Sequence, residues 1–349
     1  MNLKGLGVAM VTPFKEDGSV DFNALPKIVE NIVTGRADYL VLMGTTGETA
    51  CLTEVEKKAI IEAVVEANQG KLPLVIGIGG NNTAKVVEEI YTTDLSKFGA
   101  ILSVSPYYNK PTQEGIYQHF AKIAKASPLP IIAYNVPSRT GSSIEVDTFV
   151  RLAQDFDNII AIKEASGEMS NAEKIIKNCP AHVQVISGDD ALTLPMLLAG
   201  AVGTISVLGN ALPVPLMKMF HYIEQGELNK AYQLHYELMD LISLIFEEGN
   251  PTGEHLVTIL GFILLVPATY DDEGHELTPP VYSDKYAVDI YWGSEALASW
   301  EPYIVFPTPM GIHSYGSSSS REEYAKTYCE LFPDSLYCNP PEPTEEDLI

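Results

Sequence analysis

Short apolar segments alternate with helical segments eight times along the first 210 residues, and this alternation constrains the fold more than any other feature. The apolar segments are rich in β-branched residues and are bounded by turn residues, as buried strands are. They cover residues 7–14, 38–44, 73–79, 100–106, 130–136, 159–166, 183–190 and 201–210. Between them, apolar residues recur at spacings of three and four, which is typical of one buried face of a helix.

Eight successive β/α units predict a closed parallel barrel of the α/β class, the (β/α)8 or TIM barrel. In this fold the active site lies where strands end and loops lead into helices, so residues directly after each strand are the candidates. One helix start is clear, because Thr53 followed by Glu56 forms a capping box ahead of an apolar run. The charge-free segment 191–217 is interrupted by Gly, Asn and Pro, which favours a helix, a buried strand and a turn over a membrane span.

The character of the chain changes after the eighth strand. We expect residues 1–226 to form the catalytic barrel and residues 227–266 a C-terminal helical segment. Residues 267–349 form an atypical acidic tail that contains aromatic residues and no sustained period of 2 or 3.6. Residues 254–349 hold 17 acidic and 3 basic residues, so this quarter carries −14 of the formal net charge of −24. This composition favours partial disorder, whereas the aromatic residues favour some packing.

The negative charge disfavours nucleic acid as a partner, because phosphate binding requires clustered Lys and Arg. The cysteines are scattered, without the density of a disulfide scaffold or the CxxC pairs of a zinc site. The first residues lack the basic start and long apolar run of a signal peptide. The seven histidines show no ligand spacing around Asp189 and Asp190, so these aspartates are expected to cap a helix. We therefore expect a cytoplasmic protein without a metal or a membrane segment.

Lys163 lies within the apolar strand 159–166, and strand alternation places it on the same side as Ala161 and Ala165. These small neighbours leave room beside the amine. Burial in a barrel lowers the pKa of a lysine and exposes the neutral nucleophile that a Schiff base with a ketone requires. Alternatively, Lys163 reaches solvent or pairs with Glu164, and the lysine considered alone favours that alternative.

Other polar residues follow neighbouring strands. The phenol of Tyr134 can transfer protons, and Arg139 offers a planar fork suited to a carboxylate. The loop 44–48, Gly-Thr-Thr-Gly-Glu, presents hydroxyls and backbone NH groups to an anion. Alternatively, Tyr134 is an ordinary barrel side chain, Arg139 a surface residue and the loop a common turn. The Gly-rich segment 77–82 lacks the last glycine of a dinucleotide-binding motif and indicates a tight turn.

Taken together and in order, these motifs resemble the dihydrodipicolinate synthase and N-acetylneuraminate lyase family of class I aldolases. The resemblance covers about residues 1–253. It rests on Val11-Thr12-Pro13-Phe14, the loop 44–48, Ser105-Pro106-Tyr107-Tyr108-Asn109-Lys110-Pro111, Tyr134-Asn135-Val136-Pro137-Ser138-Arg139-Thr140-Gly141, Ile162-Lys163-Glu164-Ala165, Ser187-Gly188-Asp189-Asp190 and Gly249-Asn250-Pro251.

The resemblance implies an aldolase that needs no cofactor and in which Lys163 condenses with pyruvate. Thr45 and Thr46 would hold the pyruvate carboxylate, and the backbone of Gly188 and Ile205 would line the pocket.

The resemblance further implies a proton relay of Tyr134, Thr46 and Tyr108. In the family the tyrosine that matches Tyr108 reaches into a neighbouring subunit, which implies a homo-oligomer, at least a dimer and usually a tetramer. The match at Arg139 implies that the second substrate is L-aspartate 4-semialdehyde, on the route to diaminopimelate and lysine. Alternatives are another pyruvate-dependent aldolase, such as a sialic acid lyase, or a silent barrel whose altered tail blocks assembly.

The sequence departs from the family at two places. Feedback-inhibited members often carry histidines after the threonine loop and a glutamate on the third helix, where this chain has Glu54, Lys57 and Lys85. Positive charge at the two lysines would repel a lysine effector, so we expect weak inhibition by lysine. The chain also departs at residues 252–255, and residues 268–349 have no counterpart in the resemblance.

Overall fold

The computed structural model describes residues 1–15, 17–247, 249–251, 269–270 and 276–278. The chain divides into two compact units, one of residues 1–12 and 21–232 and one of residues 13–20 and 233–349. The first unit is the barrel, and it contains all the candidate site residues named above. Most of the predicted tail and most of the segment 248–266 lie outside the described residues.

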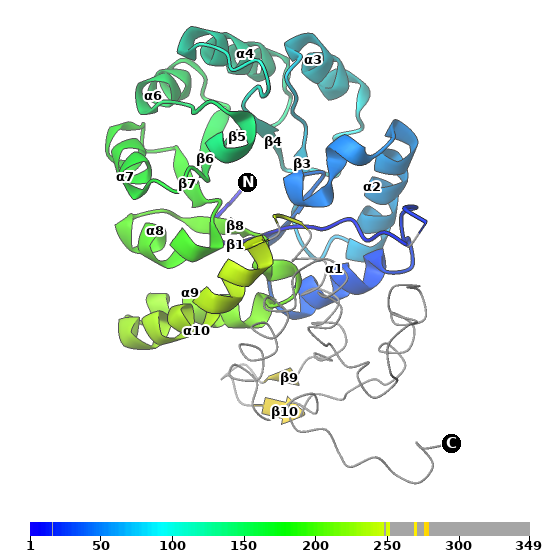
Figure 1. Ribbon diagram of the computed structural model, residues 1–349, viewed down its shortest axis with the longest axis vertical. Coiled ribbons are helices and arrows are strands. Elements are labelled where there is room, and N and C mark those ends of the chain that lie inside the picture. The colour runs from blue at the N-terminus through cyan, green and yellow to red at the C-terminus, as the bar shows by residue number, and fades with distance from the viewer. Residues whose placement is uncertain (16, 248, 252–268, 271–275, 279–349) are drawn as a thin grey trace. The chain divides into compact units, whose positions relative to one another are not determined.

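Eight parallel strands form a closed barrel in sequence order, from β1 to β8 (Figure 1). Gly203 pairs with Gly5 and Ile205 with Gly7, which joins the last strand to the first. This arrangement confirms the predicted (β/α)8 architecture. The strands are β1 (Gly5–Ala9), β2 (Tyr39–Leu42), β3 (Leu74–Gly77), β4 (Ala100–Val104), β5 (Ile131–Asn135), β6 (Ile159–Glu164), β7 (Gln184–Ser187) and β8 (Gly203–Ser206).

Helices surround the strands of the barrel unit (Figure 1). The α-helices are α1 (Leu25–Thr34), α2 (Glu54–Asn68), α3 (Thr83–Thr92), α4 (Gln113–Ala126), α5 (Pro137–Thr140), α6 (Val146–Asp155), α7 (Met169–Asn178), α8 (Thr193–Ala199), α9 (Pro213–Glu224) and α10 (Leu228–Glu247). Short 3-10 turns are η1 (Thr45–Gly47), η2 (Thr49–Cys51), η3 (Asp190–Leu192) and η4 (Leu208–Asn210). Within the second unit, β9 (Thr269–Tyr270) and β10 (Glu276–Thr278) form an antiparallel pair. Among the described residues, no helix combines the length and the apolar character that crossing a membrane requires.

Local signals in the sequence set where the elements begin. The Thr53 hydroxyl accepts a hydrogen bond from the Glu56 amide at 3.2 Å, and the Glu56 carboxylate accepts one from the Thr53 amide at 2.8 Å. The predicted capping box is therefore confirmed. β1 ends at Ala9, earlier than predicted, although Met10 and Val11 are buried beyond it. A buried loop gives the same apolar pattern as a buried strand, so the pattern alone could not place this boundary.

Side chains fill the barrel at the end where the strands begin. The Tyr39 ring is fully buried, and its hydroxyl donates to the carbonyl oxygen of Thr204 at 3.4 Å. Gly7 makes room for this ring, because a Cβ at that position would collide with it. Burial raises the pKa of Tyr39, so the phenol stays neutral. Packed side chains thus occupy this end, and the candidate site residues follow the other ends of the strands.

Candidate active site

Lys163 lies inside the barrel on β6, with only 4% of its surface exposed. Burial lowers the pKa of its amine to about 8; the Asp190 carboxylate opposes this shift, and the positive charge of Arg139 adds to it. The alternative partner, Glu164, bonds instead to the Asn135 side chain and the Ser166 amide. The lysine therefore presents a far larger neutral fraction near neutral pH than an exposed lysine does, and only the neutral amine is nucleophilic.

Tyr134 is the neighbour of Lys163 on the adjacent strand, since the two residues are paired in the register of β5 and β6. The Lys163 Nζ atom lies 4.6 Å from the centre of the Tyr134 ring. Burial raises the pKa of the phenol, while a hydrogen bond with the Thr45 side chain and the charge of Arg139 partly oppose the rise. A neutral phenol beside the amine can both donate and accept a proton.

The threonine loop follows β2 as the 3-10 turn η1. Thr46 is 2% exposed and Thr45 is half-buried. The loop is held by the Thr12 hydroxyl, which donates to the carbonyl oxygen of Gly47 at 2.7 Å. A hydrogen bond with the Thr45 side chain lowers the pKa of Tyr134, whereas the resemblance placed Thr46 in the relay. Thr45 therefore enters the relay proposed below.

Gly188 follows β7 and lies directly behind the lysine. A Cβ at this position would lie 2.9 Å from the Lys163 Cε and 2.7 Å from the Ala165 Cβ. Any larger residue would therefore displace the lysine side chain. The Gly188 amide donates to the carbonyl oxygen of Glu164 at 2.8 Å, which joins the ends of β6 and β7. Ile205 is fully buried on β8. Ser187 pairs with Thr204 in the register of β7 and β8, so Gly188 and Ile205 each lie one residue beyond that pair.

Asp189 and Asp190 play different parts. Asp189 caps η3 as expected, because its carboxylate accepts from the Ala191 amide at 2.9 Å. Asp190 binds at the start of a different turn, because its Oδ2 accepts from the amides of Val207 and Leu208, where η4 begins, at 3.0 Å each. Burial raises the pKa of Asp190, and hydrogen bonds with the Ser206 side chain and with these two amides oppose the rise. The sequence alone did not show which of the two adjacent aspartates is buried.

Arg139 and Tyr108 lie at the surface of the barrel unit. Arg139 is exposed on the short helix α5, directly after the strand that carries Tyr134. Its charge acts on both Lys163 and Tyr134, as the pKa shifts of those residues show. Tyr108 is 84% exposed and has a positive φ of 74° in the loop after β4. Within one chain its side chain is thus mostly uncovered. The part of the chain that the structure describes contains no cluster of His, Cys, Asp and Glu suited to a metal ion.

Comparison with known proteins gives consistent relatives. The sequence matches the model of the dihydrodipicolinate synthetase family over residues 2–263, ten residues further than the resemblance predicted. A 4-hydroxy-tetrahydrodipicolinate synthase from Flavobacterium psychrophilum is 57% identical over 249 residues, 71% of this chain and 85% of the relative. One from Parabacteroides distasonis is 52% identical over 264 residues, 75% of this chain and 89% of the relative.

Solved structures agree with the sequence relatives. The crystal structure of dihydrodipicolinate synthase from Aquifex aeolicus is similar with a TM-score of 0.71 at 38% identity, over 79% of this chain and 94% of that one. A closed barrel that buries a lysine beside a tyrosine has the arrangement of a class I aldolase, a lyase that forms a Schiff base between its lysine and a ketone. Within that class, the chain belongs to the dihydrodipicolinate synthetase family.

Proposed function

We propose that the chain catalyses the reaction of a 4-hydroxy-tetrahydrodipicolinate synthase, the condensation of pyruvate with L-aspartate 4-semialdehyde on the route to diaminopimelate and lysine. The observation that carries the proposal is the buried amine of Lys163, with its pKa lowered to about 8, beside Tyr134. Relatives that are 57% and 52% identical bear the name of this synthase.

The reaction begins when the neutral amine of Lys163 attacks C2 of pyruvate. The resulting carbinolamine loses water to give an imine, and loss of a proton from the methyl carbon gives an enamine. That carbon then forms the new C–C bond with the aldehyde carbon of the second substrate. The amine of the second substrate displaces Lys163 from C2 as the ring closes, which frees the lysine for the next turnover.

Protons for these steps pass through Tyr134. Its phenol lies beside the amine and bonds to Thr45, so it can give a proton to the leaving water and recover it later. We assign Thr45 to this relay on the strength of that bond, whereas the resemblance alone placed Thr46 there. Thr45 and Thr46 also offer hydroxyls to the pyruvate carboxylate, next to the backbone of Gly188 and Ile205.

Arg139 is proposed to bind the carboxylate of L-aspartate 4-semialdehyde. A guanidinium matches a carboxylate with two parallel hydrogen bonds, and its place after β5 puts it on the loop that follows Tyr134. This assignment favours the semialdehyde over the sugar acids of the lyase branch.

We propose a homo-oligomer, a dimer at least and a tetramer as in the family, in which Tyr108 completes the relay of a neighbouring subunit. The 84% exposure of Tyr108 within one chain supports this role, because a residue that enters another subunit must project from its own. We also propose a cytoplasmic location, supported by the free thiols of Cys51 and Cys179 among the described residues.

The proposal is tested by borohydride reduction of the full-length protein with pyruvate, followed by intact mass and peptide mapping. We expect one pyruvate adduct on Lys163, none in Lys163→Arg, and turnover with the semialdehyde but not with N-acetylmannosamine. An adduct without semialdehyde turnover would indicate a different aldolase. Folded protein without any adduct would indicate a silent barrel and would reject the proposal.

A further inference from the structure

The segment 142–145, directly after α5, is held by side chains at every residue. The Thr140 hydroxyl donates to the carbonyl oxygen of Ser142 at 2.6 Å, and the Gln113 amide group donates to that of Ser143 at 2.8 Å. The backbone amide of Ile144 donates to the Asn135 side chain at 2.9 Å, and that of Glu145 to the Gln113 side chain at 3.1 Å. This segment therefore fixes the end of the helical turn that carries Arg139.

Asn135 anchors the segment to the strands of the active site. It is fully buried at the end of β5, next to Tyr134. Its Nδ2 donates to the two carboxylate oxygens of Glu164 at 3.2 and 3.0 Å, and Glu164 directly follows Lys163 in β6. The carboxylate also accepts from the Ser166 amide at 2.7 Å. The Nδ2 atom of Asn135 donates to Glu164 and its Oδ1 atom accepts from the Ile144 amide, so the side-chain amide has one orientation.

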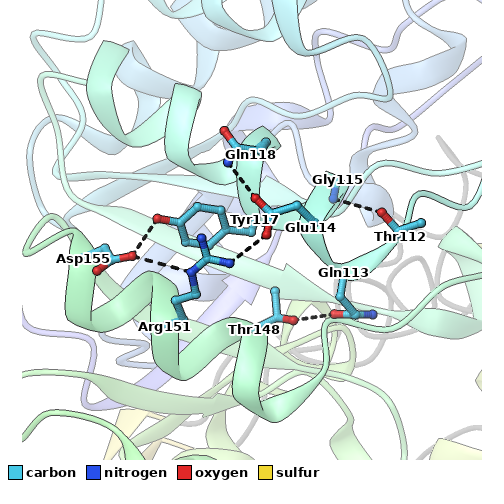
Figure 2. A network of polar contacts seen from close by, with 9 residues as sticks. All are labelled: Thr112, Gln113, Glu114, Gly115, Tyr117, Gln118, Thr148, Arg151 and Asp155. Atoms are coloured by element: carbon cyan, nitrogen blue, oxygen red, sulfur yellow. Dashed lines mark hydrogen bonds and ion pairs between the residues drawn. The ribbon is translucent and has the colours of Figure 1, made fainter.

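Gln113 anchors the same segment to α4. It is the first residue of that helix and follows the loop that carries Tyr108. Its Oε1 also accepts from the Thr148 hydroxyl of α6 at 2.7 Å (Figure 2). A few residues along the two helices, the Arg151 guanidinium stacks 3.5 Å from the centre of the Tyr117 ring and pairs with Glu114 at 2.7 Å. The start of α4 is thus held against α6.

We propose that Gln113 and Asn135 are positioning residues for the second substrate. By holding segment 142–145, they keep the helical turn α5 in the position from which Arg139 can bind the carboxylate of L-aspartate 4-semialdehyde. This inference rests on the proposed function. Neither residue needs to contact a substrate. A bidentate contact tolerates little displacement, so loosening the turn weakens binding of the carboxylate while Lys163 and Tyr134 keep their places.

The test compares Gln113→Ala with Gln118→Ala in the full-length protein. Gln118 lies on the same helix, and its side chain bonds to Glu114, away from the segment (Figure 2). We expect Gln113→Ala to raise the KM for L-aspartate 4-semialdehyde by about tenfold. The rate of pyruvate adduct formation on Lys163 should stay within about twofold of the unmodified protein, because the lysine is untouched. Gln118→Ala should change neither quantity.

A double-mutant cycle separates positioning from general loosening. In an Arg139→Ala background, Gln113→Ala should change the KM for the semialdehyde by less than about twofold, since no guanidinium remains to be aimed. Folded Asn135→Ala, as judged by its melting curve, should likewise raise the KM for the semialdehyde in the unmodified background and change it little in the Arg139→Ala background. An equal effect of Gln113→Ala in the two backgrounds, or no change in KM, would overturn the inference. Absence of any adduct in the unmodified protein would instead reject the proposed function.

Discussion

Lys163 shows how far the environment of one residue changes its chemistry. The residues on its side of the strand, Ala161 and Ala165, are small, and burial lowers the pKa of its amine from the ordinary 10.5 to about 8. Strand alternation placed the side chain inside the barrel correctly, because it follows from the backbone alone. The hydrogen-bond partners of Asn135, Glu164 and Asp190 could not be predicted in the same way, since they lie on other strands and loops that the sequence does not place beside them.

The rate of pyruvate adduct formation should rise with pH up to about 8 and then level off, because only the neutral amine attacks. Asp190 raises the pKa of Lys163, so Asp190→Asn should move this profile to lower pH. Asn retains an acceptor for the amides of Val207 and Leu208. Stopped reactions with borohydride at a series of pH values measure the profile, with Asp189→Asn as control. An unmoved profile in Asp190→Asn would show that this charge does not act on the amine.

Lys163→Met should abolish activity and stabilise the fold. The folded-state pKa is depressed, so the unfolded chain binds more protons between pH 8 and 10.5, and stability rises through that window. Below pH 8 the buried amine costs up to about 3 kcal/mol, which methionine removes. Urea unfolding at pH 7 and at pH 10 should show a large gain at the lower pH and a smaller one at the higher. Equal gains would mean that packing, not charge, explains the difference.

The sequence predicted all eight strands, and the observed bounds of β2 to β7 lie within three residues of the predicted ones. The predicted strands 7–14 and 201–210 extend well past the ends of β1 and β8. The apolar period and turn residues carry this information because they act locally. The four-residue helix α5 and the 3-10 turns were not predicted, since such short turns have no period and depend on contacts with distant side chains. These are the elements that carry Arg139, Thr45 and Asp190, which is why the site was less predictable than the scaffold.

The start of α2 bears on regulation. Lys57 pairs with Glu54 at 2.7 Å, and its charge also acts on the half-buried Glu89 of α3. A lysine effector that approached this region would meet the ammonium of Lys57. We therefore expect weak or absent inhibition by lysine. Steady-state rates with lysine from micromolar to low millimolar concentration test this expectation, and strong inhibition in that range would contradict it.

The family match ends at residue 263, whereas the chain continues to residue 349. All the proposed site residues precede residue 206, so a chain that ends at residue 267 should still form the Lys163 adduct. Light scattering of the 38.1 kDa chain should give at least twice that mass, because Tyr108 is proposed to serve a second subunit. Unchanged mass and activity after truncation would show that the tail contributes to neither assembly nor catalysis. A gain in both would mean that it interferes with assembly.

The buried ring of Tyr39 has a kinetic consequence. Side chains fill the barrel at that end, so we expect substrates to reach Lys163 from the other ends of the strands, where Arg139 is exposed. Pyruvate bound to the buried Lys163 should therefore lie deeper than an aldehyde bound by the exposed Arg139. We therefore expect ordered binding, with pyruvate first, because an aldehyde bound at Arg139 would block the way of pyruvate to Lys163. Initial rates at several fixed aldehyde concentrations would reveal this order, and random addition would contradict it.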